Sequence, residues 1–159
     1  MPPRDANYRG AMLATSLRPD HNDGRKIRVL VADDTPNMLL LLVAILEQDP
    51  AVIVAGTAAD GAAALAAAAQ LRPDLVVLDV SMPVMHGLEA ATRLRTRQPS
   101  VRILMVSADN DEDLVQACLD AGADAFLFKG DFRAQLPACL ASLFPPAQAT
   151  AADAVPQCI

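Results

Sequence analysis

The chain has 159 residues and a mass of 16.7 kDa, which is enough for one domain of ordinary size. Hydrophobic residues make up 53% of it, so a buried core is expected and disorder throughout is excluded. The net charge is −6, yet the first 26 residues carry five basic and three acidic side chains. The remainder is therefore strongly acidic, which argues against a nucleic-acid-binding surface, because phosphate contacts need clustered Lys and Arg.

The cysteines and apolar runs bear on the cellular setting. Cys118, Cys139 and Cys158 show no metal-ligand spacing, and the first two lie in apolar helical patterns typical of buried free thiols. Reduced cysteines favour a cytoplasmic location. The apolar run 38–46 is far shorter than the roughly 20 residues that span a bilayer, and the N-terminus lacks the layout of a signal peptide. No membrane contact is expected.

Both ends of the chain lack hydrophobic periodicity, whereas the middle is regular. Residues 1–25 mix Pro, Asp, Asn, Gly and Arg, and residues 145–159 are rich in Pro and Ala. These compositions predict a flexible N-terminal extension and a flexible C-terminal tail. Residues 26–144 are predicted to form the folded domain.

The first half of the domain alternates strand and helix. A β-rich apolar run ends abruptly on two acidic residues (27–34, IRVLVADD). Thr35 can then cap a helix over 36–47 that has proline at its first position, a favoured place for proline. A second strand is predicted over 51–56. Asp60–Gly61 turns the chain into an alanine-rich helix that ends near Leu71, as the high helix propensity of alanine favours.

The second half repeats this alternation. The predicted elements are a strand over 75–79, a helix over 88–97, a strand over 101–107, a helix over 111–121, a strand over 125–128 and a helix over 132–143. Five strands alternating with five helices predict a doubly wound α/β fold, with a parallel sheet covered on both faces. The nearly continuous apolar strands agree, since such strands are buried on both faces.

Unusual polar residues follow four of the predicted strands. Asp33 and Asp34 follow the first, Asp79 ends the third, Ser107 ends the fourth and Lys129 follows the fifth. In open α/β sheets, sites form beyond the carboxyl ends of the strands. Each residue alone is typical of a cap, a turn or a solvated charge, but their joint order at one edge favours a functional site.

The chemistry of this set is specific. Three carboxylates held together repel one another, and a bound cation relieves the repulsion. All-oxygen ligands suit Mg²⁺, a lysine supplies positive charge to phosphoryl oxygens, and a carboxylate can form an aspartyl-phosphate. The sequence therefore predicts phosphoryl acceptance by this set of carboxylates, with Mg²⁺ held beside them.

Four segments resemble the receiver domain of response regulators in two-component signalling, the CheY-like family. They are VLVADD (29–34), PDLVVLDVSMPVMHGLEA (73–90), ILMVSA (103–108) and AGADAFLFKG (121–130). The resemblance covers roughly residues 26–144 and implies a flavodoxin-like sheet with strand order 2-1-3-4-5. No output domain is expected after it.

The resemblance also implies roles for the acidic residues. Asp79 would accept the phosphoryl group from a sensor histidine kinase or a histidine phosphotransfer protein. Asp34, Asp79 and the backbone carbonyl of Ser81 would bind Mg²⁺ directly, and Asp33 would act mainly through water.

A second set of roles concerns the switch. Lys129 would neutralise the phosphate, Ser107 would turn towards it, and Phe126 would rotate inward when Ser107 moves. Gly130 replaces the proline that often follows this lysine in the family, which puts a cis peptide bond there in doubt, because a cis bond before a residue other than proline costs about 3 kcal/mol.

The expected protein is not an enzyme, apart from promoting its own phosphorylation and dephosphorylation. Its downstream protein partner is open, and a phosphorylation-dependent homodimer is one expectation from the family. One alternative is the detached receiver of a DNA-binding transcription regulator. Another is an Asp-nucleophile phosphohydrolase, although DDT (33–35) does not match the D-x-D of such enzymes. A dinucleotide-binding module is disfavoured because no G-x-G-x-x-G follows the first strand.

Overall fold

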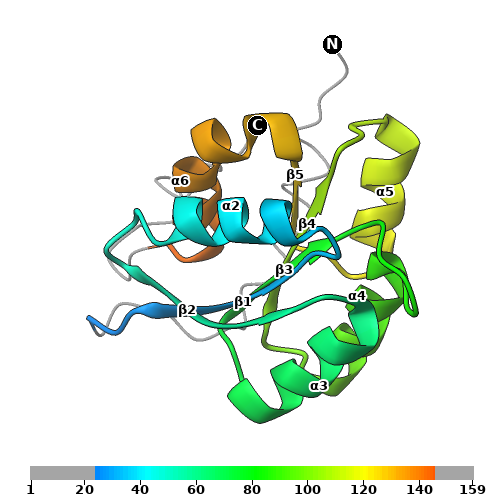
Figure 1. Ribbon diagram of the computed structural model, residues 1–159, viewed down its shortest axis with the longest axis horizontal. Coiled ribbons are helices and arrows are strands. Elements are labelled where there is room, and N and C mark those ends of the chain that lie inside the picture. The colour runs from blue at the N-terminus through cyan, green and yellow to red at the C-terminus, as the bar shows by residue number, and fades with distance from the viewer. Residues whose placement is uncertain (1–23, 146–159) are drawn as a thin grey trace.

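The computed structural model describes residues 24–145, which form a five-stranded parallel sheet flanked by helices (Figure 1). The strands are β1 (Ile27–Ala32), β2 (Val52–Ala58), β3 (Leu75–Asp79), β4 (Arg102–Ser107) and β5 (Ala125–Phe128). The helices are α2 (Pro36–Leu46), α3 (Gly61–Leu71), α4 (Gly87–Arg97), α5 (Glu112–Asp120) and α6 (Phe132–Leu143), with a short 3₁₀ helix η1 (Lys129–Asp131) before the last.

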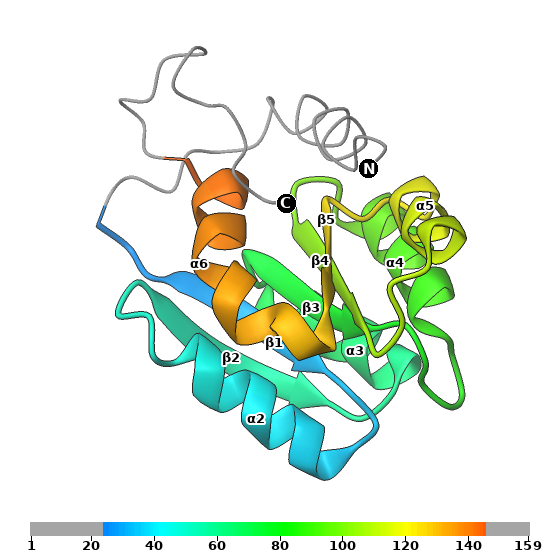
Figure 2. The same cartoon turned by 90° about the horizontal axis from the view of Figure 1, so that it is seen from above.

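The strands pair in the order β2-β1-β3-β4-β5, which confirms the predicted doubly wound fold. Helices α2 and α6 cover one face of the sheet, and α3, α4 and α5 cover the other (Figures 1 and 2). Because every strand runs in the same direction, all five carboxyl ends lie at one edge.

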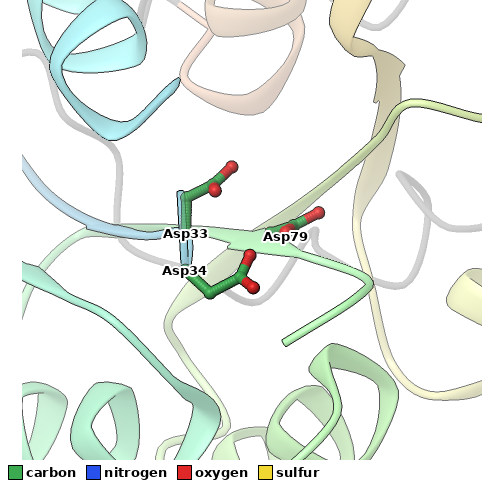
Figure 3. Close-up of side chains that lie close together, drawn as sticks. All are labelled: Asp33, Asp34 and Asp79. Carbon is green, nitrogen blue, oxygen red and sulfur yellow. The ribbon is translucent and has the colours of Figure 1, made fainter. Parts of the chain in front are cut away.

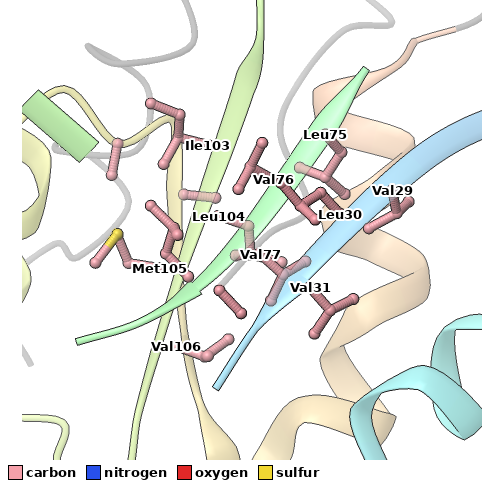
Figure 4. Packing of buried hydrophobic residues seen from close by; sticks show 14 of the residues in the cluster. Val29, Leu30, Val31, Leu75, Val76, Val77, Ile103, Leu104, Met105 and Val106 are labelled. Carbon is pink, nitrogen blue, oxygen red and sulfur yellow. The ribbon is translucent and has the colours of Figure 1, made fainter. Parts of the chain in front are cut away.

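The core lies in the central strands, whose side chains are buried on both faces of the sheet (Figure 4). This burial explains the absence of polar alternation in the sequence. The residues of β1, β3 and β4 that are fully shielded from solvent include Val29, Leu30, Val31, Leu75, Val76, Val77, Ile103, Leu104, Met105 and Val106.

Several predicted boundaries are corrected by one or two residues. The second strand occupies 52–58 rather than 51–56, because β2 stays paired with β1 as far as Ala58. The first helix ends at Leu46, and Gly61 is the first residue of α3 rather than part of a turn. Single-residue differences at the starts of α4, β4 and α5 are within the usual fraying of element ends.

The start of α2 differs from the predicted cap. Thr35 occupies the N-cap with Pro36 next to it, but the Thr35 side chain makes no capping hydrogen bond. Asp33 Oδ1 instead accepts the backbone N–H of Thr35 at 2.8 Å. A carboxylate two residues earlier therefore orders the turn that a threonine hydroxyl was expected to order.

Other expectations concern cysteines, peptide bonds and the chain ends. Cys118 and Cys139 are buried, and burial raises the pKa of the Cys118 thiol to about 12. No cis peptide bond occurs within residues 24–145, so the bond between Lys129 and Gly130 is trans. No helix in this part of the chain is long and apolar enough to cross a bilayer. Cys158 and nearly all of the two predicted tails lie outside the described residues.

One ion pair ties the opposite edge of the sheet together. The Arg95 guanidinium of α4 donates to the Asp124 carboxylate at 2.8 Å and to the carbonyls of Pro99, Val101 and Gly122. Asp124 is 2% exposed and also accepts the backbone N–H of Ile103. This Arg95–Asp124 clamp fixes the starts of β4 and β5, at the edge of the sheet opposite the carboxyl ends of the strands.

Candidate functional site

Three carboxylates meet where β1 and β3 end (Figure 3). Asp33 and Asp34 follow β1, Asp79 is the last residue of β3, and one carboxylate oxygen from each lies within 4.8 Å of the others. Asp33 and Asp79 are 1% and 4% exposed, whereas Asp34 is open to solvent. Two buried negative charges with a third beside them form a site that favours a cation.

Lys129 closes the site from the end of β5. Its ammonium lies 2.7 Å from Asp33 Oδ2 and 3.2 Å from Asp79 Oδ1. Within residues 24–145, Asp33 Oδ2 has no further partner, and its contact with the ammonium is an ion pair without good hydrogen-bond geometry. This oxygen is buried and remains available to a metal or a metal-bound water.

The surroundings of Lys129 and Asp79 raise the pKa of both groups. Burial raises the pKa of Asp79, and the neighbouring Asp33 charge adds to that rise, while Lys129 and the backbone N–H of Ser81 oppose it without cancelling it. Burial opposes the charge of Lys129, but the close contacts of its ammonium with the Asp33 and Asp79 carboxylates outweigh burial and raise the lysine pKa. Lys129 therefore stays positive at neutral pH, and the Asp79 carboxylate beside it has a raised pKa in spite of this ammonium when no metal ion is bound.

The loop between β3 and α4 is pressed against the acceptor. The backbone N–H of Ser81 donates to the Asp79 carboxylate. Gly87 N–H donates to the Val80 carbonyl at 3.0 Å, and a Cβ on Gly87 would stand 2.1 Å from the Asp79 carbonyl oxygen. Only glycine lets α4 begin this close to the acceptor backbone.

The residues expected to act in a switch lie beside the site. Ser107 is 4% exposed, and its Oγ accepts the backbone N–H of Asp109 at 3.0 Å. Phe126 pairs with Met105 across β4 and β5 and is 4% exposed. The ring of Phe126 is buried in this structure, and its rotation when Ser107 moves stays a prediction.

The residues present fit Mg²⁺. The donor set is all oxygen, with three carboxylates in reach of one another, and the buried Asp33 Oδ2 has no satisfied hydrogen bond. Mg²⁺ takes one or two carboxylates, keeps several waters and binds phosphate oxygens. Nitrogen and sulfur ligands preferred by zinc are absent from this cluster.

The response regulator receiver domain model matches residues 29–140. This match covers most of the chain and all of the strand-end residues described above. The chain belongs to the response regulator receiver domain family.

Solved receivers have the same fold as this domain. The response regulator domain of Thermotoga maritima CheB is 33% identical, with a TM-score of 0.67 over 75% of this chain and 94% of that one. The CheX–CheY–BeF₃–Mg²⁺ complex of Borrelia burgdorferi is 30% identical, with a TM-score of 0.71 over 76% of this chain and 90% of that one.

The curated relatives are longer proteins. A protein-glutamate methylesterase/protein-glutamine glutaminase of Myxococcus xanthus is 44% identical over 104 residues, which is 65% of this chain and 30% of the relative. One from Nocardioides is 46% identical over 100 residues, or 62% of this chain and 27% of the relative. The chain thus spans less than a third of these relatives, and the activity in their names is not carried over.

Two features of the site were missed by sequence reasoning. The direct pairing of Lys129 with Asp33 is set by the path of η1, which the sequence interpretation did not include. The close approach of Gly87 to Asp79 was also not predicted. The only sequence signal for it was a glycine eight residues after the acceptor at the start of a predicted helix.

Proposed function

We propose that this receiver accepts a phosphoryl group on Asp79 and that Mg²⁺ is bound by Asp34, Asp79 and the Ser81 backbone carbonyl, with Asp33 acting through water. The observation that carries the proposal is the set of three carboxylate oxygens within 4.8 Å of one another, with Lys129 paired to two of the acids. The donor would be a sensor histidine kinase or a histidine phosphotransfer protein.

The residues supply most of the chemistry. An Asp79 carboxylate oxygen attacks phosphorus, the O–P bond forms, the P–N bond to the donor histidine breaks, and the imidazole leaves with its electron pair and takes up a proton. Lys129 offers its ammonium to the phosphoryl oxygens, and the Ser107 hydroxyl can donate to one of them. Bound Mg²⁺ would neutralise charge on the carboxylates and the phosphoryl oxygens.

The same groups would assist loss of the phosphoryl group to water, so self-promoted phosphorylation and dephosphorylation are the extent of the proposed catalysis. Methylesterase or glutaminase activity is not proposed. The acidic balance of the sequence supports signalling through protein contact rather than nucleic acid, in the cytoplasm, where thiols stay reduced. The downstream partner would recognise the face that contains Phe126, and a homodimer is one form of that contact.

The surface beside the acceptor suggests where the donor protein contacts the receiver. Helix α2 has no charged residue and begins directly after the acidic pair. Leu40 and Leu41 on this helix are 68% and 46% exposed. A donor that delivers phosphate to Asp79 must cover this edge of the sheet, and exposed leucines are the apolar anchors that such contacts use.

This contact predicts a selective defect. Replacing Leu40 and Leu41 with Gln should slow transfer from a protein donor at least about tenfold and leave acetyl phosphate reactivity unchanged. Ile53→Gln is the matched control, because Ile53 is 47% exposed but lies on β2 in the half away from the site edge. Equal loss with both donors would contradict the docking role.

Incubation with acetyl phosphate, with and without Mg²⁺, tests the proposed function. Intact mass should show one phosphoryl adduct that is stable in acid, labile in base and dependent on Mg²⁺. Absence of the adduct from folded protein would overturn the proposal. Multiple turnovers of a generic phosphatase substrate without a stable adduct would instead favour the phosphohydrolase.

A further inference from the structure

The loop that carries Ser81 contains a strained turn. The Met85 N–H donates to the Pro83 carbonyl at 2.7 Å, and the φ of Val84 between them is +67°. A hydrogen bond to the second preceding residue with positive φ is the rarer and more strained form of γ-turn, and a β-branched residue seldom adopts positive φ. The Val84 side chain is 85% exposed, so its own packing does not hold the turn.

The start of α3 braces this turn. Gly61, the first residue of the helix, is buried, and a Cβ there would stand 2.4 Å from the Met85 carbonyl oxygen and 3.0 Å from Met85 Cβ. Real Cβ atoms do not come that close, and a backbone carbonyl cannot swing away as a side chain can. Asp60 fixes the helix start by accepting the Ala63 N–H at 2.7 Å. Only glycine at position 61 therefore allows α3 and the turn to touch.

The other parts of the loop are also fixed. Met82 is 3% exposed and packed in the core, and the Gly87 N–H closes the loop on the Val80 carbonyl. Ser81 lies inside this closed segment, with its N–H on the Asp79 carboxylate. Ser81 and Met85 are thus four residues apart in a loop that is anchored at Met82 and closed at Gly87.

We propose that Gly61 is a positioning residue for metal binding, which holds the strained turn at Val84 and thereby keeps the Ser81 segment against the Asp79 carboxylate. The proposal rests on the Mg²⁺ site proposed above. Pre-organised ligands lose less conformational entropy on binding, and residues that orient metal ligands typically change affinity by 10- to 100-fold when replaced.

Calorimetric titration with Mg²⁺ tests this role in the full chain. Gly61→Ala should weaken Mg²⁺ binding about tenfold, although alanine has the higher helix propensity. Gly56→Ala is the matched control. Its Cβ would meet the movable end of the Leu71 side chain at 2.6 Å and the end of the Leu30 side chain at 3.8 Å, and no backbone atom of the loop, so its Mg²⁺ affinity should equal that of wild type. If wild type itself does not bind Mg²⁺, the proposed metal site is wrong. If wild type and folded Gly61→Ala bind Mg²⁺ equally, the positioning role of Gly61 is wrong.

Val84→Gly tests the role of the strained turn with a substitution in the loop itself. It also covers the case in which Gly61→Ala does not fold. Glycine removes the strain at positive φ, so urea unfolding should show no loss of stability beyond about 1 kcal/mol. Mg²⁺ affinity should not fall, because glycine adopts the positive φ without strain and Gly61 still holds Met85 in place. A several-fold fall in Mg²⁺ affinity would show that the Val84 side chain, and not Gly61, sets the turn, and would overturn the proposal.

Discussion

Ionisation of the Asp79 carboxylate is electrostatically unfavourable when the site holds no metal ion. Burial, then the Asp33 charge, raise its pKa in the folded protein against the pull of Lys129. A raised folded pKa contributes stability below the unfolded value of about 3.9, and that stability is lost as pH rises through the folded pKa. At neutral pH without metal, the ionised Asp79 therefore destabilises the fold.

Asp79→Asn removes this ionisation. In EDTA, the variant should exceed wild type in free energy of unfolding by about 1 kcal/mol at pH 7, and the difference should shrink towards pH 4. Urea denaturation at both pH values measures it. The raised pKa of Lys129 does not interfere, since its contribution is lost only as pH rises above about 10.4. An equal difference at both pH values would contradict the assignment.

Lys129 has the opposite effect, because it compensates two buried acids. Lys129→Gln should lower the free energy of unfolding by about 3 kcal/mol in EDTA, the typical loss when a buried ion pair is broken. Mg²⁺ should restore part of this loss. Lys26→Gln is the control, since Lys26 is exposed and its replacement should change stability by less than about 0.5 kcal/mol. Unfolding curves that match for the two variants would refute the compensating role.

At the scale of elements, the Arg95–Asp124 clamp between α4 and the starts of β4 and β5 should contribute to stability and not to phosphoryl acceptance. Arg95→Ala removes a close ion pair with the buried Asp124 carboxylate and should lower the free energy of unfolding by about 3 kcal/mol in urea. Arg93→Ala on the same helix breaks only a half-exposed pair with Glu89 and should cost under about 0.5 kcal/mol. Both folded variants should still form the acetyl phosphate adduct; its loss in Arg95→Ala would place the clamp in the acceptor chemistry.

Over the whole molecule, the order of strand ends was predictable, because parallel strands bring their carboxyl ends to one edge. Asp33, Asp34, Asp79 and Lys129 therefore came together as expected. The contact of Gly61 with Met85 could not be predicted, since it joins the start of one helix to a loop before another.

The central claim is that Asp79, and not a neighbouring acid, receives the phosphoryl group. The most direct measurement is the intact mass of wild type, Asp79→Asn and Asp34→Asn after acetyl phosphate treatment with Mg²⁺, followed by mass analysis of the peptide that contains residue 79. The account predicts one adduct on Asp79 in wild type, a slower adduct on the same residue in Asp34→Asn, and none in Asp79→Asn. An adduct of equal yield in Asp79→Asn, or one located on Asp33 or Asp34 in wild type, would contradict it.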